Sequence, residues 1–578
     1  MEKGSNILDI FTEVIGFTDA TAPNEPTQTL SNQSASPRAK FSQKLLLLFL
    51  LLLAFAWRTA FDHSHTVQAA ANSSSASQPF SNPIFPGDHP DPTIIRVGHT
   101  YWTTSTSGDW GPEFPLFRSD DLHYWTQIGS IFPSTPSWAS GSFWAPELVN
   151  DGHRIVVYYA ARKRDGPLCV AAATAIQPEG PYTDHGPLIC QSDGSIDPSM
   201  VRDEHGQPFL VWKEDGNSIG KPTPIWVQPL TDDLLHLTGS KTQLIVNDTN
   251  TWEGSVVEAP YVLRRAGSFY LFYAGNACCG VACHYAEGVA RASHLLGPWM
   301  KDPANPIIGP NAAWRCPGHG TAVETPSGSD YFLYHAYPTV GSVYLGRESV
   351  LDTIQWTPDG WPVINGGRGP GGGADQQEDL ATLPPLIDNF DRDQLAPGWT
   401  WPIGRRPTWQ VGGDKLILDS FADDHPAFLA QPLLTASYEA SVGVQRGCDA
   451  TQGLGIVGRT GREVTLSRSG NHLELWSLRG TNRTSLWQTG LAPAEVVWLR
   501  INASGQHDFT YSYSFDRQHW IDAGATLDVA GLLAGDQGLR VGLVATGSAG
   551  THACFVHFGL KATPNSIIPH STNAMRVH

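Results

Sequence analysis

A pattern that recurs five times in the first half of the sequence constrains the fold more than any other feature. In each copy, a carboxylate or histidine beside a proline or glycine is followed by a turn, an aromatic strand and a second hairpin. The prolines of the first four copies recur about every 50 to 60 residues, which is enough chain for four short strands. The copies begin at Asp91-Pro92, Pro146-Glu147, Asp197-Pro198, Glu258-Ala259-Pro260 and Gly318-His319-Gly320.

A short aromatic or β-branched run follows the start of every copy and is typical of the second strand of a hairpin. Four-stranded units repeated radially form a β-propeller, in which the first strand of each blade lines the central channel. Five unrelated hairpins of one large sandwich would not explain why the acids recur at the same point of the unit. We therefore predict an all-β fold with a five-bladed propeller over residues 82–365. The runs are Tyr101 to Thr103, Val156 to Tyr159, Phe209 to Trp212, Phe269 to Tyr273 and Tyr331 to Tyr334.

A second all-β domain is predicted after the propeller. Residues 366–385 open with a Gly/Pro-rich run and have the composition of a flexible linker. Residues 386–563 contain many short strand-like segments, such as Tyr511 to Phe515, which indicate an antiparallel jelly-roll β-sandwich. Residues 564–578 have the character of an unstructured tail.

Length and composition narrow the class of protein. The 578 residues are too many for one compact core and suggest two to four domains. Only 16% are charged, while 58 Gly, 43 Pro and 20 Trp residues favour a turn-rich all-β protein. The formal charge of -18, without a Lys/Arg cluster outside the N-terminus, argues against nucleic acid as a partner and favours a neutral or basic substrate.

Residues 1–80 are interpreted as an N-terminal tail that carries an export signal or a membrane anchor. The apolar run 45–57 follows basic residues such as Arg38 and Lys44 and precedes three small residues at 69–71, which is the order found in an export signal. The run is shorter than the roughly 20 residues that span a bilayer, which favours a cleaved signal, although the long stretch before it leaves an anchor open. Both interpretations predict a secreted or extracellular protein.

The even number of cysteines in a chain predicted to be exported favours disulfide bonds. The first two flank one predicted hairpin, and the last two lie in the C-terminal part. The cluster at 278–283, with His284 beside it, could be interpreted as metal ligands, but it lacks the paired C-x2-C spacing of a zinc site. Disulfides are therefore predicted here as well, with their connectivity open. The eight are Cys169, Cys190, Cys278, Cys279, Cys283, Cys316, Cys448 and Cys554.

Three acids at the starts of repeats, Asp91, Asp197 and Glu258, are the candidate catalytic residues. A single Asp before Pro is best interpreted as a turn cap, but three acids at corresponding points of different repeats favour catalysis. Hydrolysis by general acid–base catalysis needs one carboxylate to deprotonate water and one carboxylic acid to protonate the leaving group. Acids on different blades can lie on opposite sides of a bound substrate. Glu147 also fits the repeat, and we interpret it as structural or as a rim contact.

The third acid of the set could be Glu253 or Glu258. The distance along the chain from each acid to the following aromatic strand is about 10 to 12 residues for Asp91, Asp197 and Glu258, and longer for Glu253. The repeat register therefore predicts that Glu258 occupies the same point of its strand as the other two acids. Glu253 is expected in the preceding loop, where it could contact substrate at the rim.

An opening and six further motifs follow one another in the first half and are specific only in combination. With them the chain resembles glycoside hydrolase family 43 over about residues 82–365. The resemblance implies an inverting hydrolase that cleaves α-L-arabinofuranosyl or β-D-xylosyl linkages in plant cell-wall polysaccharide. The motifs are Asn82-Pro83 with His89-Pro90-Asp91-Pro92 and Arg96-Val97-Gly98, then Trp144-Ala145-Pro146-Glu147, Ile196-Asp197-Pro198-Ser199, Glu258-Ala259-Pro260, Pro317-Gly318-His319-Gly320, Leu345-Gly346-Arg347-Glu348 and Asp359-Gly360-Trp361-Pro362.

The resemblance also implies roles for individual residues. Asp91 matches the family's general base, Asp197 the acid that modulates pKa values, and Glu258 the general acid. A like charge raises a neighbouring carboxyl's pKa, so Asp197 is expected to keep Glu258 protonated near neutral pH while Asp91 stays ionised.

Three further residues are candidates for the substrate site. Arg347 matches a substrate-contacting arginine, and His319 matches a channel histidine that often lies near a bound cation, so a calcium ion is possible there by resemblance. Trp144 is either a platform for sugar stacking or a core residue. No organic cofactor is implied, and the expected partner is a polysaccharide or oligosaccharide bound by a monomer. The second half resembles the concanavalin A-like sandwich that many family members carry.

Two other functions remain as alternatives. Propeller enzymes that cleave sucrose and fructans also use three acids but retain configuration through an aspartate nucleophile, and they normally open with Trp-Met-Asn-Asp-Pro-Asn-Gly. This chain has His89-Pro90-Asp91-Pro92 instead, and Ile196 precedes its middle acid where those enzymes have Arg. The other alternative is a carbohydrate-binding protein without catalysis. The presence of all three acids counts against it, and turnover of an aryl pentoside would separate the two.

Overall fold

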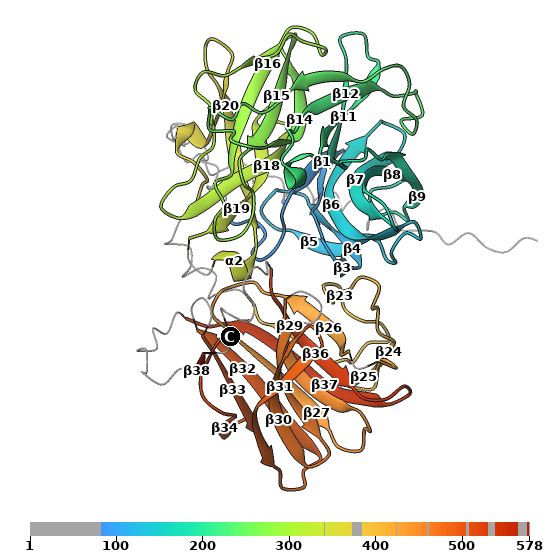
Figure 1. Ribbon diagram of the computed structural model, residues 1–578, viewed down its shortest axis with the longest axis vertical. Helices are drawn as coiled ribbons and strands as arrows, with labels where there is room; N and C mark the ends of the chain where they lie inside the picture. The colour runs from blue at the N-terminus through green and yellow to red at the C-terminus, as the bar shows by residue number, and fades with distance from the viewer. Residues whose placement is uncertain are drawn as a thin grey trace, which may run out of the picture. The chain divides into compact units, whose positions relative to one another are not determined.

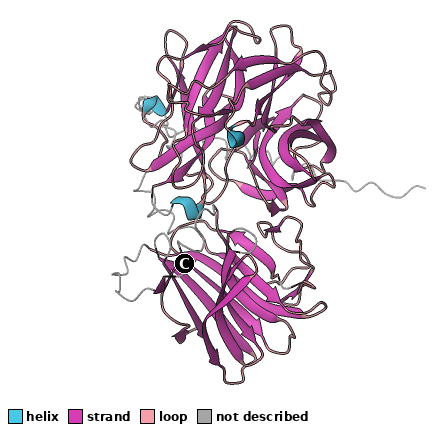
Figure 2. Cartoon of the chain, viewed as in Figure 1, coloured by secondary structure: helices cyan, strands magenta, loops and turns pink. Residues whose placement is uncertain are grey.

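The computed structural model describes residues 82–339, 342–372, 384–423, 425–458, 462–504, 508–529, 538–564 and 575–576. Within these ranges the regular elements are strands, apart from the short helical segments α2 (Ser342–Leu345), η1 (Asn217–Ile219) and η2 (Asn365–Gly367) (Figures 1 and 2). The predicted all-β class is therefore confirmed. The predicted leader lies outside the described residues. In the described part of the chain, no helix is long and apolar enough to cross a membrane.

Five four-stranded antiparallel sheets occupy the described residues of the first half, and in each sheet the four strands are neighbours in chain order. Sheet 1 contains β1 (Thr93–Val97), β2 (Thr100–Thr104), β4 (Glu113–Ser119) and β5 (Thr126–Phe132). Sheet 2 contains β6 (Ala139–Asn150), β7 (Ile155–Lys163), β8 (Leu168–Ala175) and β9 (Thr183–Ile189). Sheet 3 contains β10 (Ser195–Arg202), β11 (Pro208–Glu214), β12 (Ile225–Pro229) and β13 (Thr242–Ile245).

The fourth and fifth sheets repeat this order. Sheet 4 contains β14 (Val257–Arg265), β15 (Ser268–Gly275), β16 (Ala286–Ala292) and β17 (Met300–Lys301). Sheet 5 contains β18 (Trp314–Glu324), β19 (Asp330–Pro338), β20 (Glu348–Trp356) and β21 (Pro362–Ile364). The first strand of each sheet contacts the first strand of the next, and β18 contacts β1, so the five sheets form a closed ring.

Apolar clusters between neighbouring sheets hold this ring together. Phe114 and Tyr159 belong to the cluster between sheets 1 and 2, and Ile94 and Leu333 to the cluster between sheets 5 and 1. The three other pairs of neighbouring sheets share clusters of the same kind. Both faces of β7 are covered, so seven successive residues of this strand are buried. Its sequence is therefore a continuous apolar run and does not alternate between apolar and polar residues.

The second half folds into two larger sheets, whose strands are antiparallel apart from one short parallel pair, and this confirms the predicted C-terminal β-sandwich. Their facing side chains, such as Leu454, Leu499 and Phe555, form one continuous core. One sheet contains β22 (Leu386–Asp388), β24 (Trp409–Val411), β25 (Leu416–Asp419), β27 (Tyr438–Gln445), β32 (Val496–Ser504), β33 (Asp508–Ser514), β34 (Trp520–Asp522), β35 (Leu527–Asp528), β37 (His552–Ala562) and β38 (Met575–Arg576). The other contains β26 (Ala427–Pro432), β28 (Thr451–Val457), β29 (Arg462–Ser469), β30 (His472–Arg479), β31 (Asn482–Gly490) and β36 (Arg540–Thr546).

The start of the predicted linker is held in place by hydrogen bonds. The indole of Trp314 donates to the carbonyl of Gly371, and the amide of Gly371 donates to Asp352. The start of this segment is therefore bonded to the fifth sheet, although its Gly/Pro content suggested a flexible segment. The rest of that linker, residues 373–383, lies outside the described residues, as does most of the predicted tail.

All eight cysteines form disulfides. This confirms the prediction, which included the cluster at 278–283. Cys169 pairs with Cys190, Cys283 with Cys316, and Cys448 with Cys554. The fourth bond joins the adjacent residues Cys278 and Cys279. The alternative of a metal site in this cluster is therefore excluded.

Candidate active site

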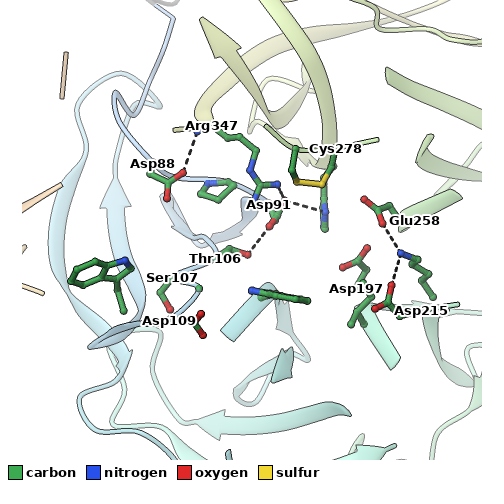
Figure 3. Close-up of a pocket in the computed structure, with 18 of the residues that line it drawn as sticks. Asp88, Asp91, Thr106, Ser107, Asp109, Asp197, Asp215, Glu258, Cys278 and Arg347 are labelled. Carbon is green, nitrogen blue, oxygen red and sulfur yellow. Dashed lines mark hydrogen bonds and ion pairs between the residues drawn. A yellow bond between two sulfur atoms is a disulfide. The ribbon is translucent and has the colours of Figure 1, made fainter. Parts of the chain in front are cut away.

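A cavity of about 610 Å³ opens where the first strands of the sheets begin. All six residues that the sequence proposed for catalysis or substrate contact line it: Asp91, Trp144, Asp197, Glu258, His319 and Arg347. Figure 3 shows the three carboxylates around this one cavity. Residues from all five sheets therefore meet at a single site, although they lie far apart in the sequence.

A repeated β-bulge positions these side chains. Within β6, β10, β14 and β18, two successive residues lie opposite a single residue of the next strand, and the first of the two has a positive φ. Asp91, just before β1, has the same positive φ of 53°. A bulge turns side chains away from the regular alternation of a strand, so the bulged residue or the one just before it can point into the cavity. The five positive-φ positions are Asp91, Ala145, Asp197, Ala259 and His319.

Glu258 does not occupy the same point as Asp91 and Asp197, which corrects the register inferred from the sequence. The positive-φ residue of β14 is Ala259, and Glu258 precedes it and pairs with Ala274. Its counterparts in sheets 2 and 3 are Trp144 and Ile196, which pair with Ala160 and Lys213. Distances counted along the chain to the next strand could not resolve this shift of one residue.

Asp91 is held as a carboxylate by the groups around it. The Arg347 guanidinium donates to its Oδ1 at 2.9 Å, and the Thr106 hydroxyl donates to its Oδ2 at 2.7 Å. His319 Nδ1 lies 3.4 Å from the same Oδ1. Burial opposes ionisation, but the charge of Arg347, with a smaller contribution from His319, outweighs it and holds the pKa of Asp91 well below its usual value. An ionised Asp91 can accept a proton.

His335 holds the backbone of Asp91 by a hydrogen bond. It is fully buried, and burial together with the Arg347 charge lowers its pKa to about 4. Its ring is therefore neutral near pH 7, and its Nδ1 accepts a hydrogen bond from the backbone amide of Asp91 at 3.1 Å. This contact fixes the strained backbone that carries the carboxylate.

Glu258 is paired with a buried lysine that sequence reasoning did not identify. Lys213 Nζ, on a side chain that is 1% exposed, donates to Glu258 Oε2 at 2.7 Å and to Asp215 Oδ1 at 2.9 Å (Figure 3). The Tyr285 hydroxyl donates to Glu258 Oε1 at 2.8 Å. Burial opposes ionisation of Glu258, but Lys213, Tyr285 and His319 outweigh it and lower its pKa.

Asp197 has the opposite shift. Burial is the largest effect, and together with the charges of Glu258 and Asp91 it raises the pKa of Asp197 to about 6, against His319 and Lys213. These two shifts run against the expectation that Asp197 keeps Glu258 protonated. The proton shared by the pair rests on Asp197, because Lys213 stabilises the ionised form of Glu258.

Two other glutamates, Glu253 and Glu147, do not line this cavity. Glu253 is in the loop before β14, as predicted, but it is 1% exposed and bonded to the Tyr273 hydroxyl, Lys301 and the amide of Asp248. The suggestion that it contacts substrate at the rim is therefore wrong. Glu147 is also buried and accepts a hydrogen bond from the Thr93 hydroxyl, and burial raises its pKa to about 8. Its place between two sheets agrees with the structural interpretation.

The surroundings of His319 do not suit a calcium ion. Asp91, which lies 3.4 Å from His319 Nδ1, is already paired with Arg347, and Glu287 accepts a hydrogen bond from the His319 amide, whereas Ca²⁺ requires several unpaired oxygen ligands. Among the described residues no group of three or more His, Cys, Asp or Glu side chains is arranged to hold a metal. We derive no step through a metal ion.

The cavity wall also contains residues that carried no recognisable signal in the sequence. Trp110 comes from β3 (Trp110–Gly111), which pairs with β23 (Trp401–Pro402) of the second half, and the Arg540 guanidinium lies 4.7 Å from the centre of its ring. The disulfide of Cys278 and Cys279 also lines the cavity. For Lys213, the sequence did contain one indication. The run Lys213-Glu214-Asp215 follows a predicted buried strand, and charged residues at such a place usually have a partner of opposite charge.

Comparisons with known proteins agree with this geometry. Residues 80–362 match the model of glycosyl hydrolases family 43, and residues 387–561 match that of the beta xylosidase C-terminal concanavalin A-like domain. A xylosidase/arabinosidase 43B of Humicola insolens is 29% identical over 314 residues, 50% of this chain and 55% of that protein. A xylosidase/arabinosidase of Butyrivibrio fibrisolvens is 29% identical over 309 residues, 50% of this chain and 57% of that protein. The chain thus spans just over half the length of these two relatives.

A solved structure extends the likeness across both halves. The GH43 protein BlXynB of Bacillus licheniformis is 25% identical and superposes with a TM-score of 0.70, covering 84% of this chain and all of that one. The arrangement of sheets described above is therefore shared with that GH43 protein.

Proposed function

Since residues 80–362 make this chain a member of glycosyl hydrolase family 43, we propose that it hydrolyses α-L-arabinofuranosyl or β-D-xylosyl linkages of plant polysaccharides with inversion. The observation that carries the proposal is the pair of carboxyl environments in one cavity. Asp91 is held ionised by Arg347, whereas Asp197 and Glu258 share one proton near pH 6. The xylosidase and arabinosidase names of the relatives support the choice of sugars.

In this proposal Asp91 is the general base. It accepts a proton from a water molecule as that water attacks the anomeric carbon, and Arg347, Thr106 and His335 keep its carboxylate in place. As the glycosidic C–O bond breaks, Glu258 donates a proton to the leaving oxygen. The water's oxygen ends on the released sugar, and the two carboxyls return to their starting states through solvent.

The proposal requires that the proton shared with Asp197 reach Glu258 when substrate is bound. Lys213 opposes this while it bonds to Glu258, and its second partner, Asp215, offers an alternative position for the ammonium. A bound sugar that excludes water from the cavity raises the pKa of the carboxyl beside its leaving oxygen. We assign to Asp197 the role of holding the proton that Glu258 uses.

The remaining features of the proposal follow from the fold and the N-terminal sequence. We interpret the five sheets as the blades of a five-bladed propeller over residues 82–365, and residues 386–563 as the sandwich domain. Trp144 is half-buried, lines the cavity and is a candidate platform for a sugar ring. The basic and apolar order within residues 1–80 supports an exported protein that acts on polysaccharide as a monomer.

A substrate panel tests the activity. The wild-type protein is incubated with 4-nitrophenyl α-L-arabinofuranoside, 4-nitrophenyl β-D-xyloside and linear arabinan, and turnover of at least one is expected. Proton NMR of the first sugar released should show inverted configuration. Absence of turnover on every substrate would favour a carbohydrate-binding protein, and a retained anomer would favour a nucleophilic aspartate.

A further inference from the structure

The bond between Cys278 and Cys279 is not needed to restrain the loop that carries it. The loop joins β15 to β16 and is already tied to β18 by the Cys283–Cys316 disulfide. The amide of Gly280 donates to the Tyr337 hydroxyl, and the amide of His284 donates to the carbonyl of Ala277. A cross-link stabilises a fold mainly by closing a long loop in the unfolded chain, and a bond between adjacent residues closes almost none.

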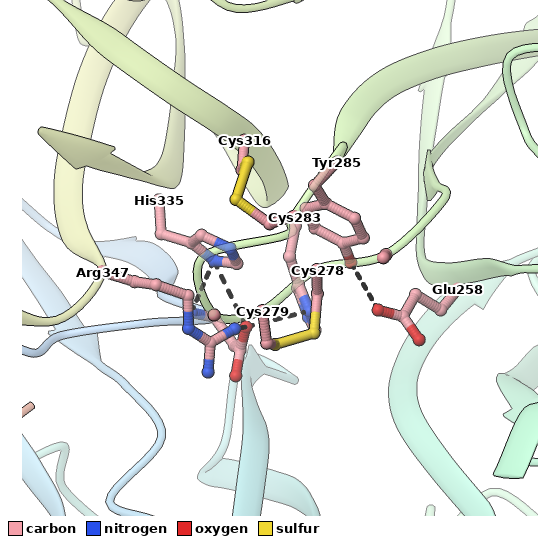
Figure 4. The surroundings of a disulfide bond; sticks show 12 residues. Glu258, Cys278, Cys279, Cys283, Tyr285, Cys316, His335 and Arg347 are labelled. Carbon is pink, nitrogen blue, oxygen red and sulfur yellow. Dashed lines mark hydrogen bonds and ion pairs between the residues drawn. A yellow bond between two sulfur atoms is a disulfide. The ribbon is translucent and has the colours of Figure 1, made fainter. Parts of the chain in front are cut away.

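The position of this disulfide points to the substrate. Cys278 and Cys279 both line the cavity and are half-buried, and Cys278 packs against the cluster that contains Tyr285 and Tyr337. Figures 3 and 4 place Cys278 between Arg347 and Glu258. Arg347 contacts the proposed general base, and Glu258 is the proposed general acid. A glycosidic bond placed between these two groups brings its sugar beside the sulfur atoms.

The chemistry of a disulfide suits this place. The cavity around the acids is strongly charged, because Asp88, Asp91, Asp197, Lys213 and Arg347 all line it. A sugar ring presents C–H groups as well as hydroxyls, and the C–H groups need an apolar surface. Two bonded sulfur atoms are polarisable, carry no N–H or O–H donor and pack well against C–H groups. Adjacent cysteines hold them in a fixed position without the rotamer freedom of Met or Leu.

We propose that the Cys278–Cys279 disulfide is a contact surface for the C–H groups of the pentosyl unit whose linkage lies between Asp91 and Glu258. The inference rests on the proposed function and adds a specificity-determining element to it. The disulfide takes no part in proton transfer. Its contribution is to the affinity for the sugar, because the contact is present in the ground state and the transition state alike.

Two double variants that remove both sulfur atoms test this role. Cys278→Ser/Cys279→Ser and Cys278→Ala/Cys279→Ala both lack the disulfide, and they differ in that only the first adds hydroxyls to the wall. KM and kcat are measured on whichever pentoside the wild-type protein hydrolyses, and the affinity for the free pentose is measured by calorimetry. A matched control, Cys169→Ala/Cys190→Ala, removes a disulfide that does not line the cavity.

The serine pair is expected to raise KM about 5- to 10-fold and the alanine pair about 3-fold, since a methylene-sized apolar contact is worth roughly a factor of four. In both variants kcat should stay within about 2-fold of wild type, and the affinity for free pentose should fall in parallel with KM. The control is expected to leave KM unchanged even where its melting temperature falls.

Three outcomes would overturn the inference. Unchanged KM in both cavity variants would show that the sulfurs do not touch the sugar. Equal losses in the two variants, with lower melting temperatures, would show that the bond only restrains the loop. In either case turnover by the wild-type protein leaves the proposed function standing. A wild-type protein inactive on every pentoside would overturn the proposed function, and this inference with it.

Discussion

Replacement of Lys213 by Met should move the alkaline limit of activity to higher pH. The lysine Nζ lies 2.7 Å from Glu258 Oε2, and its charge is the main force that keeps the Glu258 pKa low. A cation this close lowers the pKa of a carboxyl by about 1 to 3 units. Lys213→Met removes that charge and leaves Asp215 and Asp197 nearby, and both of these carboxyls favour a protonated Glu258.

The sign of the effect follows from the protonation states that the mechanism requires. The active form carries one proton on the Asp197 and Glu258 pair and none on Asp91. The wild-type pair loses this proton as the pH rises through about 6, the pKa of Asp197, so activity should decline above that pH. In the variant the pair retains its proton to a pH about 1 to 3 units higher. The acidic limit belongs to Asp91, whose partners are unchanged, and it should stay in place.

The assay is kcat/KM against pH on a disaccharide rather than a nitrophenyl glycoside, because only a poor leaving group needs the proton from Glu258. Lys301→Met is the matched control, since Lys301 also lies 2.7 Å from a buried glutamate, Glu253, but not in the cavity. Its profile should match that of wild type. An unchanged alkaline limit in a folded Lys213→Met variant would refute the reasoning, as would an equal shift in the control.

Three further predictions concern the acids themselves. Asp91→Asn should reduce kcat at least about 100-fold, because an amide cannot accept the proton of water, and retention of more than about a tenth of the activity would contradict its role as base. Glu258→Ala should abolish hydrolysis of disaccharides but retain much of the rate on nitrophenyl glycosides, and equal losses on both would contradict its role as acid. Glu253→Ala should instead lower the free energy of unfolding by about 1 to 3 kcal/mol, because the buried Tyr273 hydroxyl loses the acceptor of its hydrogen bond. Urea denaturation measures that loss, and the substrate preference of the folded variant should not change.

The strands and the convergence of the site residues could be predicted because they follow from local pattern and repetition. The runs Val156 to Tyr159 and Phe209 to Trp212 fall inside β7 and β11, and the motifs that resemble the family supply residues of one cavity. These features depend on side-chain type at a fixed place in each repeat. A single sequence contains that information.

Lys213 and the pairing of Cys278 with Cys279 could not be predicted in the same way. The partner of Lys213 is in the next sheet, and no local pattern indicates that a lysine at the end of a buried strand faces a glutamate 45 residues later. Eight cysteines allow many pairings, and a bond between neighbours depends on the path of a tightly tied loop. Both features arise from tertiary packing, which also reversed the expected order of the Asp197 and Glu258 pKa values.

The shift of one residue between Asp197 and Glu258 explains why two carboxyls of one cavity have different environments. Both belong to bulges of the same kind, but Asp197 is the positive-φ residue of its bulge, whereas Glu258 precedes that residue. Lys213 is the strand-pairing partner of Ile196, which occupies the position in sheet 3 that Glu258 occupies in sheet 4. From this position the Lys213 side chain bonds to Glu258. Asp197 instead accepts a hydrogen bond from the amide of Ala259, while the Lys213 ammonium bonds to Glu258 and Asp215. One repeated backbone feature therefore gives two adjacent acids opposite pKa shifts, because the residue that carries the acid differs by one place.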